Sequence, residues 1–285
     1  MLLTCVILNY NDSDTTISLH HKIKDYHVLD KIVIVDGAST DDSYEKLAAI
    51  LNEKTVLLSA DRNGGYGYGN NIGIRYSSSL GAKYVLIANP DVEFSEHAII
   101  ACLNMIKKNE NSVAVAPRIQ GRQPAFSFAP PLKDTLSSSI ILNKFFSPRY
   151  YPPRFFLDKN FCEVFALPGS LVMFDIDKFM NCGLYDEEVF LYNEEVIIGK
   201  KFKEYGYKSI LCLNESYQHF HSVSVGKAYK TSLKPKKFEL ASHALYLRKY
   251  CNAGKLPLAL LSLIKPLTYL ECLIWPWLKS KIHGK

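Results

Sequence analysis

The strongest constraint on the fold is a regular alternation, within residues 2–116, of short apolar runs and segments with helical spacing. Strands that alternate with helices favour a mainly parallel sheet covered by helices on both faces. The sequence therefore predicts an α/β fold. The expected strands span residues 2–8, 31–35, 55–58, 84–88 and 113–116, and the expected helices span residues 14–26, 41–51, 68–80 and 95–108.

The second half of the chain is organised differently. Residues 117–161 hold seven prolines interleaved with aromatic residues, a composition typical of a functional loop or lid in an α/β protein. Regular structure is expected again at 164–174, as a helix at 194–205, as a strand at 208–213 and as helices at 236–250 and 256–278. At 285 residues, the chain suits one large domain, residues 1–225, followed by a helical appendage, residues 226–285.

The net positive charge of the chain comes from the appendage. From Lys227 onward there are 12 Lys and Arg against 2 Asp and Glu, while the net charge of the chain is +6. Nucleic acid and an anionic membrane surface are both candidate partners, and the apolar content favours the membrane. Residues 256–278 have the length of a membrane span, but three prolines and two charged residues argue against a simple span. Two tryptophans beside two lysines, a combination that suits a membrane interface, are Trp275, Trp277, Lys279 and Lys281. The alternative is that the appendage forms a helix pair packed on the core or on another subunit.

The seven cysteines indicate a reducing compartment. They are scattered, odd in number, without a CxxC pair, and several lie in apolar runs. The N-terminal segment lacks a basic n-region and a small-residue cleavage site, so it is interpreted as a first strand rather than a signal peptide.

Polar residues follow three of the first four expected strands. They are Asn9-Tyr10-Asn11, Asp36 and Asn89-Pro90-Asp91. Because parallel strands place their carboxyl ends at one edge of the sheet, these groups should converge on a single crevice. Turn chemistry explains any one of them alone. The three together favour a ligand site.

Two further stretches carry candidate site residues. The glycine-rich stretch RNGGYGYGNNIGIRY, residues 62–76, lets a backbone approach a ligand closely, but it fits neither the P-loop nor the dinucleotide fingerprint. A flexible loop followed by a helix is the alternative. Glu194 and Glu195 stand at the start of an expected helix, where they suit either the helix dipole or a general base.

The order and spacing of these motifs resemble the family 2 glycosyltransferases, most closely the bacterial rhamnosyltransferase-like branch that builds surface polysaccharides such as O-antigen and capsule. The matching segments are VILNYN, VDGASTD, RNGGYGYGNN, NPD, GS, YDEE, FLYNEE and a His before a Ser, within residues 2–225. The resemblance implies a GT-A fold and an inverting, metal-dependent transfer from a nucleoside-diphosphate-sugar. Galactose, glucose, N-acetylglucosamine and rhamnose donors are all compatible with it.

The resemblance also implies a donor pocket. Asp36 matches the acid that contacts the nucleobase, and Asn89-Pro90-Asp91 matches the family's Asp-x-Asp position with Asn in first place. Asp91 is then the main protein ligand for Mg²⁺ or Mn²⁺ on the diphosphate. The other donor-binding residues implied are Asn9, Tyr10, Asn11, Arg62, Asn63, Gly65, Asn70, Asn71 and Asn89.

The family's Glu-Asp pair matches Glu194-Glu195, which makes Glu195 the base by position. Because Glu is one methylene longer than the family's Asp, Glu194 stays a second candidate for the base. Ile197 stands where the family has its next acidic residue. His219 matches a histidine, five residues before Ser224, that approaches the diphosphate or metal; His221 is the weaker candidate. Gly169, Ser170 and Asp186 match the acceptor side, and the alternative for Asp186 is to cap a turn.

Two other functions compete with this interpretation. A nucleotidyltransferase would want a basic, glycine-rich segment after the first strand, where Asn9 to Asp12 stand instead. A catalytically inactive scaffold subunit is consistent with Asn89 and with Ile197.

The expected partners follow from the resemblance and the charge. They are a nucleoside-diphosphate-sugar, a polyprenyl-diphosphate-linked glycan acceptor, an anionic membrane surface bound through residues 226–285, and a second copy of the chain, but no nucleic acid. The expected location is the cytoplasm, peripheral on the inner face of the bacterial cell membrane.

Overall fold

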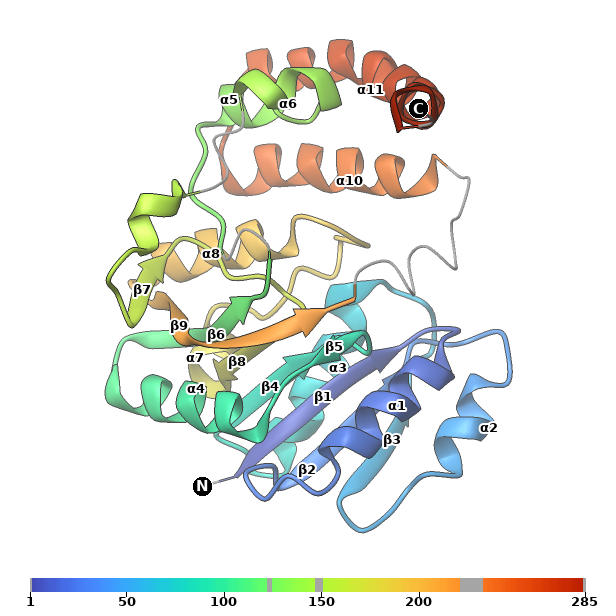
Figure 1. Cartoon of the computed structure of the whole chain (residues 1–285), viewed down its shortest axis with the longest axis vertical. Coiled ribbons are helices and arrows are strands. Elements are labelled where there is room, and N and C mark those ends of the chain that lie inside the picture. The colour runs from blue at the N-terminus through green and yellow to red at the C-terminus, as the bar shows by residue number, and fades with distance from the viewer. Residues whose placement is uncertain (1, 122–124, 147–150, 221–232, 284–285) are drawn as a thin grey trace.

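A computed structural model of the chain describes residues 2–121, 125–146, 151–220 and 233–283 (Figure 1). Within these residues, nine strands form a sheet in the order β3-β2-β1-β4-β8-β6-β9-β5, with β7 paired to β9. The strands are β1 (Leu3–Asn9), β2 (Lys31–Asp36), β3 (Thr55–Ser59), β4 (Tyr84–Ala88), β5 (Val92–Glu93), β6 (Ser112–Ile119), β7 (Phe161–Val164), β8 (Leu171–Asp175) and β9 (Lys208–His219).

Strands β1 to β4 are parallel, as the alternation predicts, and their register aligns Asn9 with Asp36. Strand β8 is antiparallel to both β4 and β6, between which it lies. It follows the long excursion rather than a helical crossover, so the simple alternation does not determine its direction. The sheet is therefore mixed.

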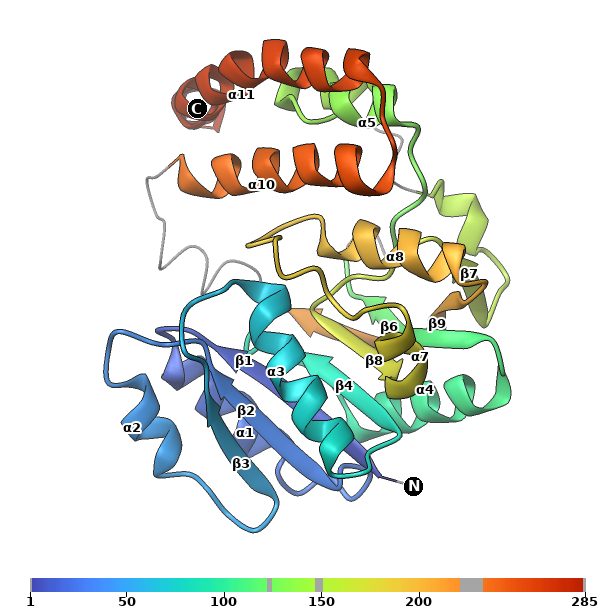
Figure 2. The ribbon, with the colours of Figure 1, turned by 180° about the vertical axis from the view of Figure 1, so that it is seen from behind.

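Helices cover both faces of the sheet. Figure 1 shows α1 (Ser13–Ile23), α2 (Ser43–Ala48) and α4 (Glu96–Lys108) on one face. Figure 2, from behind, shows α3 (Tyr66–Ser79), α7 (Ile176–Asn181) and α8 (Glu194–Glu204) on the other. Each face has its own apolar cluster, because strand residues point alternately to the two sides. The Ser95 side chain accepts a hydrogen bond from the Ala98 N–H and so caps the N-terminus of α4.

A helical layer stands above the sheet and joins two parts of the sequence (Figure 1). Its members are α5 (Pro131–Leu136), α6 (Ile140–Phe146), α10 (Lys234–Leu245), the π-helical turn η2 (Tyr246–Tyr250) and α11 (Lys255–His283). The excursion also contains a short 3₁₀ turn, η1 (Pro153–Phe156). The expected boundary at 225/226 lies outside the described residues and stays a prediction.

Glu271 of α11 ties the excursion to the appendage. Its carboxylate accepts hydrogen bonds from the Ser139 hydroxyl and the Ile140 N–H, both at 2.7 Å. These bonds cap the N-terminus of α6, where unpaired N–H groups and the helix dipole favour a negative charge. Glu271, one of the two charged residues that argued against a membrane span, is therefore buried inside the layer.

Helix α11 is longer than expected and contains the three prolines that argued against a simple membrane span. Pro257 lies in its first turn, where a missing N–H costs little. The part Lys255–Ile274 is long and apolar enough to cross a membrane by length and composition. Its buried side faces the layer: Leu261, Ile264, Thr268 and Glu271.

Candidate functional site

Asp91 and His219 meet at the carboxyl edge of the sheet. Strand β4 ends at Ala88 and Pro90 interrupts the ladder; β5 then pairs antiparallel with the end of β9. This pairing brings His219 Nε2 to 3.2 Å from the Asp91 Oδ1 atom. Both side chains are buried. His221 and Ser224, the other histidine-motif residues, lie outside the described residues.

This pair fits a divalent ion that arrives with a phosphate ligand. A carboxylate oxygen and an imidazole nitrogen are suitable ligands for Mn²⁺, and Mg²⁺ is commonly held by one or two carboxylates plus substrate phosphates. Within the described part of the chain, no three His, Cys, Asp or Glu groups are close enough to hold a metal by themselves. The remaining ligands would have to be diphosphate oxygens and water.

The first two strand ends form one hydrogen-bonded unit. Asn9 Nδ2 donates to the Asp36 Oδ1 atom at 2.9 Å, and the Ser39 hydroxyl donates to the same oxygen at 2.6 Å. The Ser39 N–H donates to the second Asp36 oxygen at 2.9 Å. Asn11 holds the same loop, since its side chain accepts from the Thr40 N–H at 2.7 Å. Tyr10 is half-buried beside them. Asn9 and Asp36 thus both stabilise the loop after β2.

The glycine-rich loop wraps against the segment before α8. Gly65 has φ 90°, and a Cβ placed on it would lie 2.1 Å from the Phe190 carbonyl oxygen, so only glycine fits here. The Tyr66 N–H donates to that oxygen at 2.9 Å. Asn63 accepts from the Gly65 N–H at 3.2 Å, and the exposed Arg62 guanidinium stacks over a tyrosine ring 4.5 Å away.

The two asparagines of α3 have different surroundings. Asn70 donates to the Tyr66 carbonyl oxygen at 3.0 Å, while its own Oδ1 atom is buried without a hydrogen-bond partner. Asn71 is fully engaged: its Nδ2 donates to the Tyr185 carbonyl oxygen and its Oδ1 accepts from the Tyr185 N–H. A buried amide paired in this way supports residues 185–187, and the donor-binding role of Asn71 stays a prediction.

The Gly169-Ser170 turn connects the Asp91 edge to the glutamate pair. Ser170 accepts from the Asn89 N–H at 2.8 Å through its carbonyl oxygen, and its hydroxyl lies 2.7 Å from the Tyr217 hydroxyl. Burial is the main cause that raises the pKa of Tyr217, and the negative charges of Glu195 and Asp91 add to it. Tyr217 therefore lies within electrostatic reach of both carboxylates.

Glu194 and Glu195 begin α8 in unlike environments. Glu195 is half-buried, and the Gly169 N–H donates to its Oε1 atom at 3.4 Å. Glu194 is buried, and its Oε1 atom has no hydrogen-bond partner. Burial and the adjacent Glu195 raise the pKa of Glu194 to about 8. Only Glu195 has the exposure that a base in contact with substrate needs. Ile197 is buried in an apolar cluster with Tyr246 of the helical layer.

Asp186 does not lie open to an acceptor. It receives hydrogen bonds from the Tyr250 hydroxyl at 2.6 Å and from the Lys249 ammonium at 2.9 Å. Burial opposes the charge, but these bonds outweigh it and lower the pKa of Asp186. Asp186 thus joins the segment before α8 to the helical layer, and its acceptor-side role stays a prediction.

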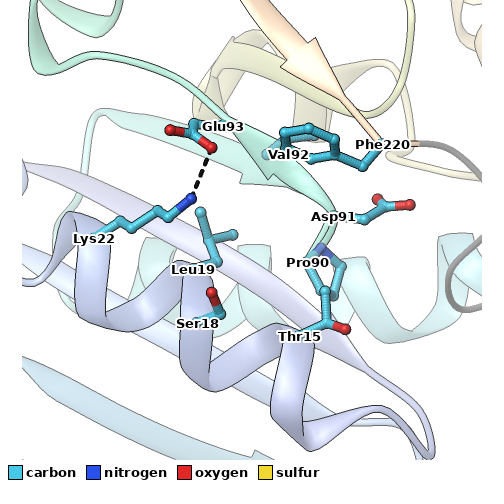
Figure 3. A pocket seen from close by; sticks show the side chains of 9 residues that line it. All are labelled: Thr15, Ser18, Leu19, Lys22, Pro90, Asp91, Val92, Glu93 and Phe220. Carbon is cyan, nitrogen blue, oxygen red and sulfur yellow. Dashed lines mark hydrogen bonds and ion pairs between the residues drawn. The ribbon is translucent and has the colours of Figure 1, made fainter.

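Sequence reasoning missed two features of the site. Tyr66 and Tyr217 contact the turn between the two carboxylates. Tyr66 lies in the glycine-rich stretch, but only the glycines, the asparagines and Arg62 of that stretch were predicted as site residues. A small pocket of about 280 Å³ also adjoins Asp91 from the side of α1. Figure 3 shows Lys22 paired with Glu93 at its edge and Pro90 facing α1. The Lys22 Nζ atom lies 2.7 Å from the Glu93 Oε2 atom.

Comparison with known proteins gives consistent results. A family model described as glycosyl transferase family 2 matches residues 4–178. The low-salt glycan biosynthesis hexosyltransferase Agl10 of Haloferax volcanii is 28% identical over 196 residues, which are 68% of this chain and 59% of Agl10. The N-acetylglucosaminyl-diphospho-decaprenol L-rhamnosyltransferase of Mycobacterium tuberculosis is 26% identical over 216 residues, which are 69% of this chain and 68% of that protein. The chain thus spans less than two thirds of Agl10.

Solved structures share the architecture at low sequence identity. GalNAc-T7 with UDP, GalNAc and Mn²⁺ superposes with a TM-score of 0.61 at 15% identity, over 88% of this chain and 57% of that one. The mannosyltransferase PcManGT from Pyrobaculum calidifontis, in complex with GDP-Man and Mn²⁺, gives a TM-score of 0.58 at 13% identity, over 95% and 68% of the two chains.

Proposed function

Since the chain belongs to glycosyl transferase family 2 and has the GT-A fold expected from its sequence, we propose that it transfers a sugar from a nucleoside-diphosphate-sugar to a lipid-linked glycan. The observation that carries this proposal is the position of the Gly169-Ser170 turn. One end of the turn accepts a hydrogen bond from the N–H of Asn89, two residues before Asp91, and the other end donates one to Glu195. A site of this kind has a place for a leaving diphosphate and a base beside it.

Asp91 and His219 are the residues that would hold Mg²⁺ or Mn²⁺ together with the donor. When bound, the ion would supply positive charge for the leaving diphosphate. Both solved relatives described above contain Mn²⁺ with a nucleotide or nucleotide-sugar. Two protein ligands can hold the divalent ion only if diphosphate oxygens complete its coordination shell. The metal ion and the nucleotide should therefore bind together.

Glu195 is proposed as the general base. It would accept the proton of an acceptor hydroxyl while the hydroxyl oxygen bonds to the anomeric carbon and the bond from that carbon to the diphosphate breaks. One displacement of this kind inverts the anomeric configuration. Glu194 is unsuited to the role because it is buried and holds its own proton near neutral pH.

The acceptor is proposed to be a polyprenyl-diphosphate-linked sugar presented at an anionic membrane. The mycobacterial relative is named for a decaprenol-linked acceptor. In this chain the outward side of α11 exposes leucines, with Leu263 76% and Leu270 53% exposed, while Glu271 is turned inward. An apolar helix face within a basic segment suits insertion into the headgroup region rather than a span. The side chains of Trp275 and Trp277 lie outside the described set.

Titration of the protein with UDP, dTDP and GDP, each with and without Mn²⁺, tests the donor site. We expect one nucleotide to bind, with an affinity that needs Mn²⁺ and falls by on the order of 100-fold in Asp91→Ala. Asp14→Ala is the matched control, since its carboxylate is 85% exposed on α1. Nucleotide binding by Asp91→Ala that equals wild type would contradict the proposed donor site.

A further inference from the structure

The segment of residues 184–193 is held from two sides immediately before the glutamate pair. On the sheet-domain side, Phe190 accepts the Tyr66 N–H with its carbonyl oxygen, and Gly65 packs against that same oxygen. Asn71 pairs with both the N–H and the carbonyl oxygen of Tyr185. The segment is therefore continuous with the loop proposed to bind the donor.

On the other side, the helical layer contacts the same segment through ring packing and hydrogen bonds. The Phe190 ring packs against Phe238 of α10 with 4.6 Å between the ring centroids. The Ser242 hydroxyl donates to the Leu191 carbonyl oxygen at 2.8 Å. From the end of η2, the Tyr250 hydroxyl donates to Asp186 at 2.6 Å. These contacts come from two neighbouring elements of the layer, so they act on the segment as one surface.

The backbone of the segment needs this support. Tyr192 and Asn193 have φ values of 71° and 68°, in the left-handed region that side chains disfavour. They stand directly before Glu194, so their conformation sets the direction in which α8 leaves the segment. Strained residues of this kind persist only where surrounding contacts fix them. Here the Asn193 side chain donates to the Glu239 carbonyl oxygen of α10 at 3.3 Å.

We propose that the helical layer positions the catalytic site: Tyr250 and Ser242 hold residues 184–193, and through them Glu195 and the glycine-rich loop. Tyr250 and Ser242 are positioning residues and need not touch substrate. The catalytic part of this inference rests on the proposed function, whereas the mechanical coupling does not. A layer that docks at a membrane would then carry the base and the donor loop with it as one unit.

Hydrogen–deuterium exchange of the full chain tests the coupling without a substrate. In Tyr250→Phe combined with Ser242→Ala, amides of residues 184–196 and of residues 63–69 should exchange about tenfold faster than in wild type, because two hydrogen bonds to the segment are lost. Tyr269→Phe is the matched control, since this tyrosine packs inside the layer with Leu240 and Leu261. Wild-type exchange in both ranges of the double variant would overturn the proposal.

Turnover supplies a second measurement with a separate meaning. With wild-type melting behaviour preserved, Tyr250→Phe should lower kcat by on the order of tenfold, and Tyr269→Phe should stay near wild type. Equal kcat values in wild type and Tyr250→Phe would overturn the positioning role. A wild-type protein without turnover would count against the proposed function alone, because exchange still reports the coupling.

Discussion

Glu194 contributes to the pH dependence of stability, because its carboxyl group is buried. The pKa of Glu194 is raised from 4.5 to about 8. Between these values the folded chain keeps a proton that the unfolded chain releases, so the free energy of unfolding should decrease as pH rises. Glu194→Gln removes this titration. We expect the unfolding free energy of wild type to fall by on the order of 1–3 kcal/mol between pH 5 and 8 because of Glu194, and this part of the fall to be absent in Glu194→Gln.

Urea unfolding of wild type and Glu194→Gln across pH 5–8.5 measures this difference. Glu53→Gln serves as the control, because Glu53 is exposed and should leave the slope unchanged. Parallel pH profiles for wild type and Glu194→Gln would show that Glu194 is ionised in the folded protein.

Some residue roles were predictable from sequence and others were not. The meeting of Asp91 with His219 was expected, because the NPD motif and the histidine each stand at a recognisable place in the chain. The ligand roles of Asn71 and Asp186 follow from the family resemblance and stay predictions, while in the structure both side chains hold neighbouring segments. The polar groups that suit ligand contacts also serve buried hydrogen bonds, and only the three-dimensional partners distinguish the two uses.

At the element scale, Gly65 shows how closely the glycine-rich loop approaches its neighbour. Gly65→Ala would force a Cβ to within 2.1 Å of the Phe190 carbonyl oxygen, so the backbone must shift. Gly81 is a matched control: it also has a positive φ, 78°, but an added Cβ meets nothing within 4 Å. We expect Gly81→Ala to cost about 1 kcal/mol of stability from backbone strain alone, and Gly65→Ala at least twice that. Equal losses in urea unfolding would contradict the close approach.

Glu271 is the second element-scale test, because it unites the excursion with α11. Glu271→Ala leaves the α6 N-terminus and the Ser139 hydroxyl without their acceptor, and we expect a loss of about 2–4 kcal/mol of unfolding free energy. Glu271→Gln should recover part of this loss, since its amide oxygen still accepts. Wild-type stability of Glu271→Ala would mean that the cap contributes nothing.

The parallel direction of strands β1 to β4 could be predicted because each βα unit is local and its pattern lies within about thirty residues. The direction of β8 and the packing of α5 and α6 on α11 could not. Strand β8 pairs with residues of β4 and β6 that lie 58 to 91 positions away, and α11 meets α6 across more than a hundred positions, as Glu271 and Ser139 do. No local periodicity encodes such a pairing.

At the scale of the whole molecule, the layer presents an apolar outer side within the basic part of the chain. We expect wild-type protein to float with vesicles that contain anionic lipid, less so as salt rises. Leu263→Glu with Leu270→Glu should abolish flotation, because charges replace two exposed leucines. Leu51→Glu, at an exposed leucine of the sheet domain, should float like wild type. Flotation of the double variant equal to wild type would contradict the assignment of the docking face to α11.

The central claim is that Glu195 deprotonates an acceptor beside a donor held at Asp91. The most direct measurement is mass-spectrometric detection of sugar transfer from UDP-, dTDP- and GDP-sugars to a polyprenyl-diphosphate-linked sugar with Mn²⁺, by wild type, Glu195→Gln and Glu194→Gln. We predict transfer from one donor, a loss of on the order of 1,000-fold in Glu195→Gln with nucleotide binding intact, and a much smaller loss in Glu194→Gln. Transfer by Glu195→Gln at the wild-type rate, or none from any donor by wild type, would contradict the claim.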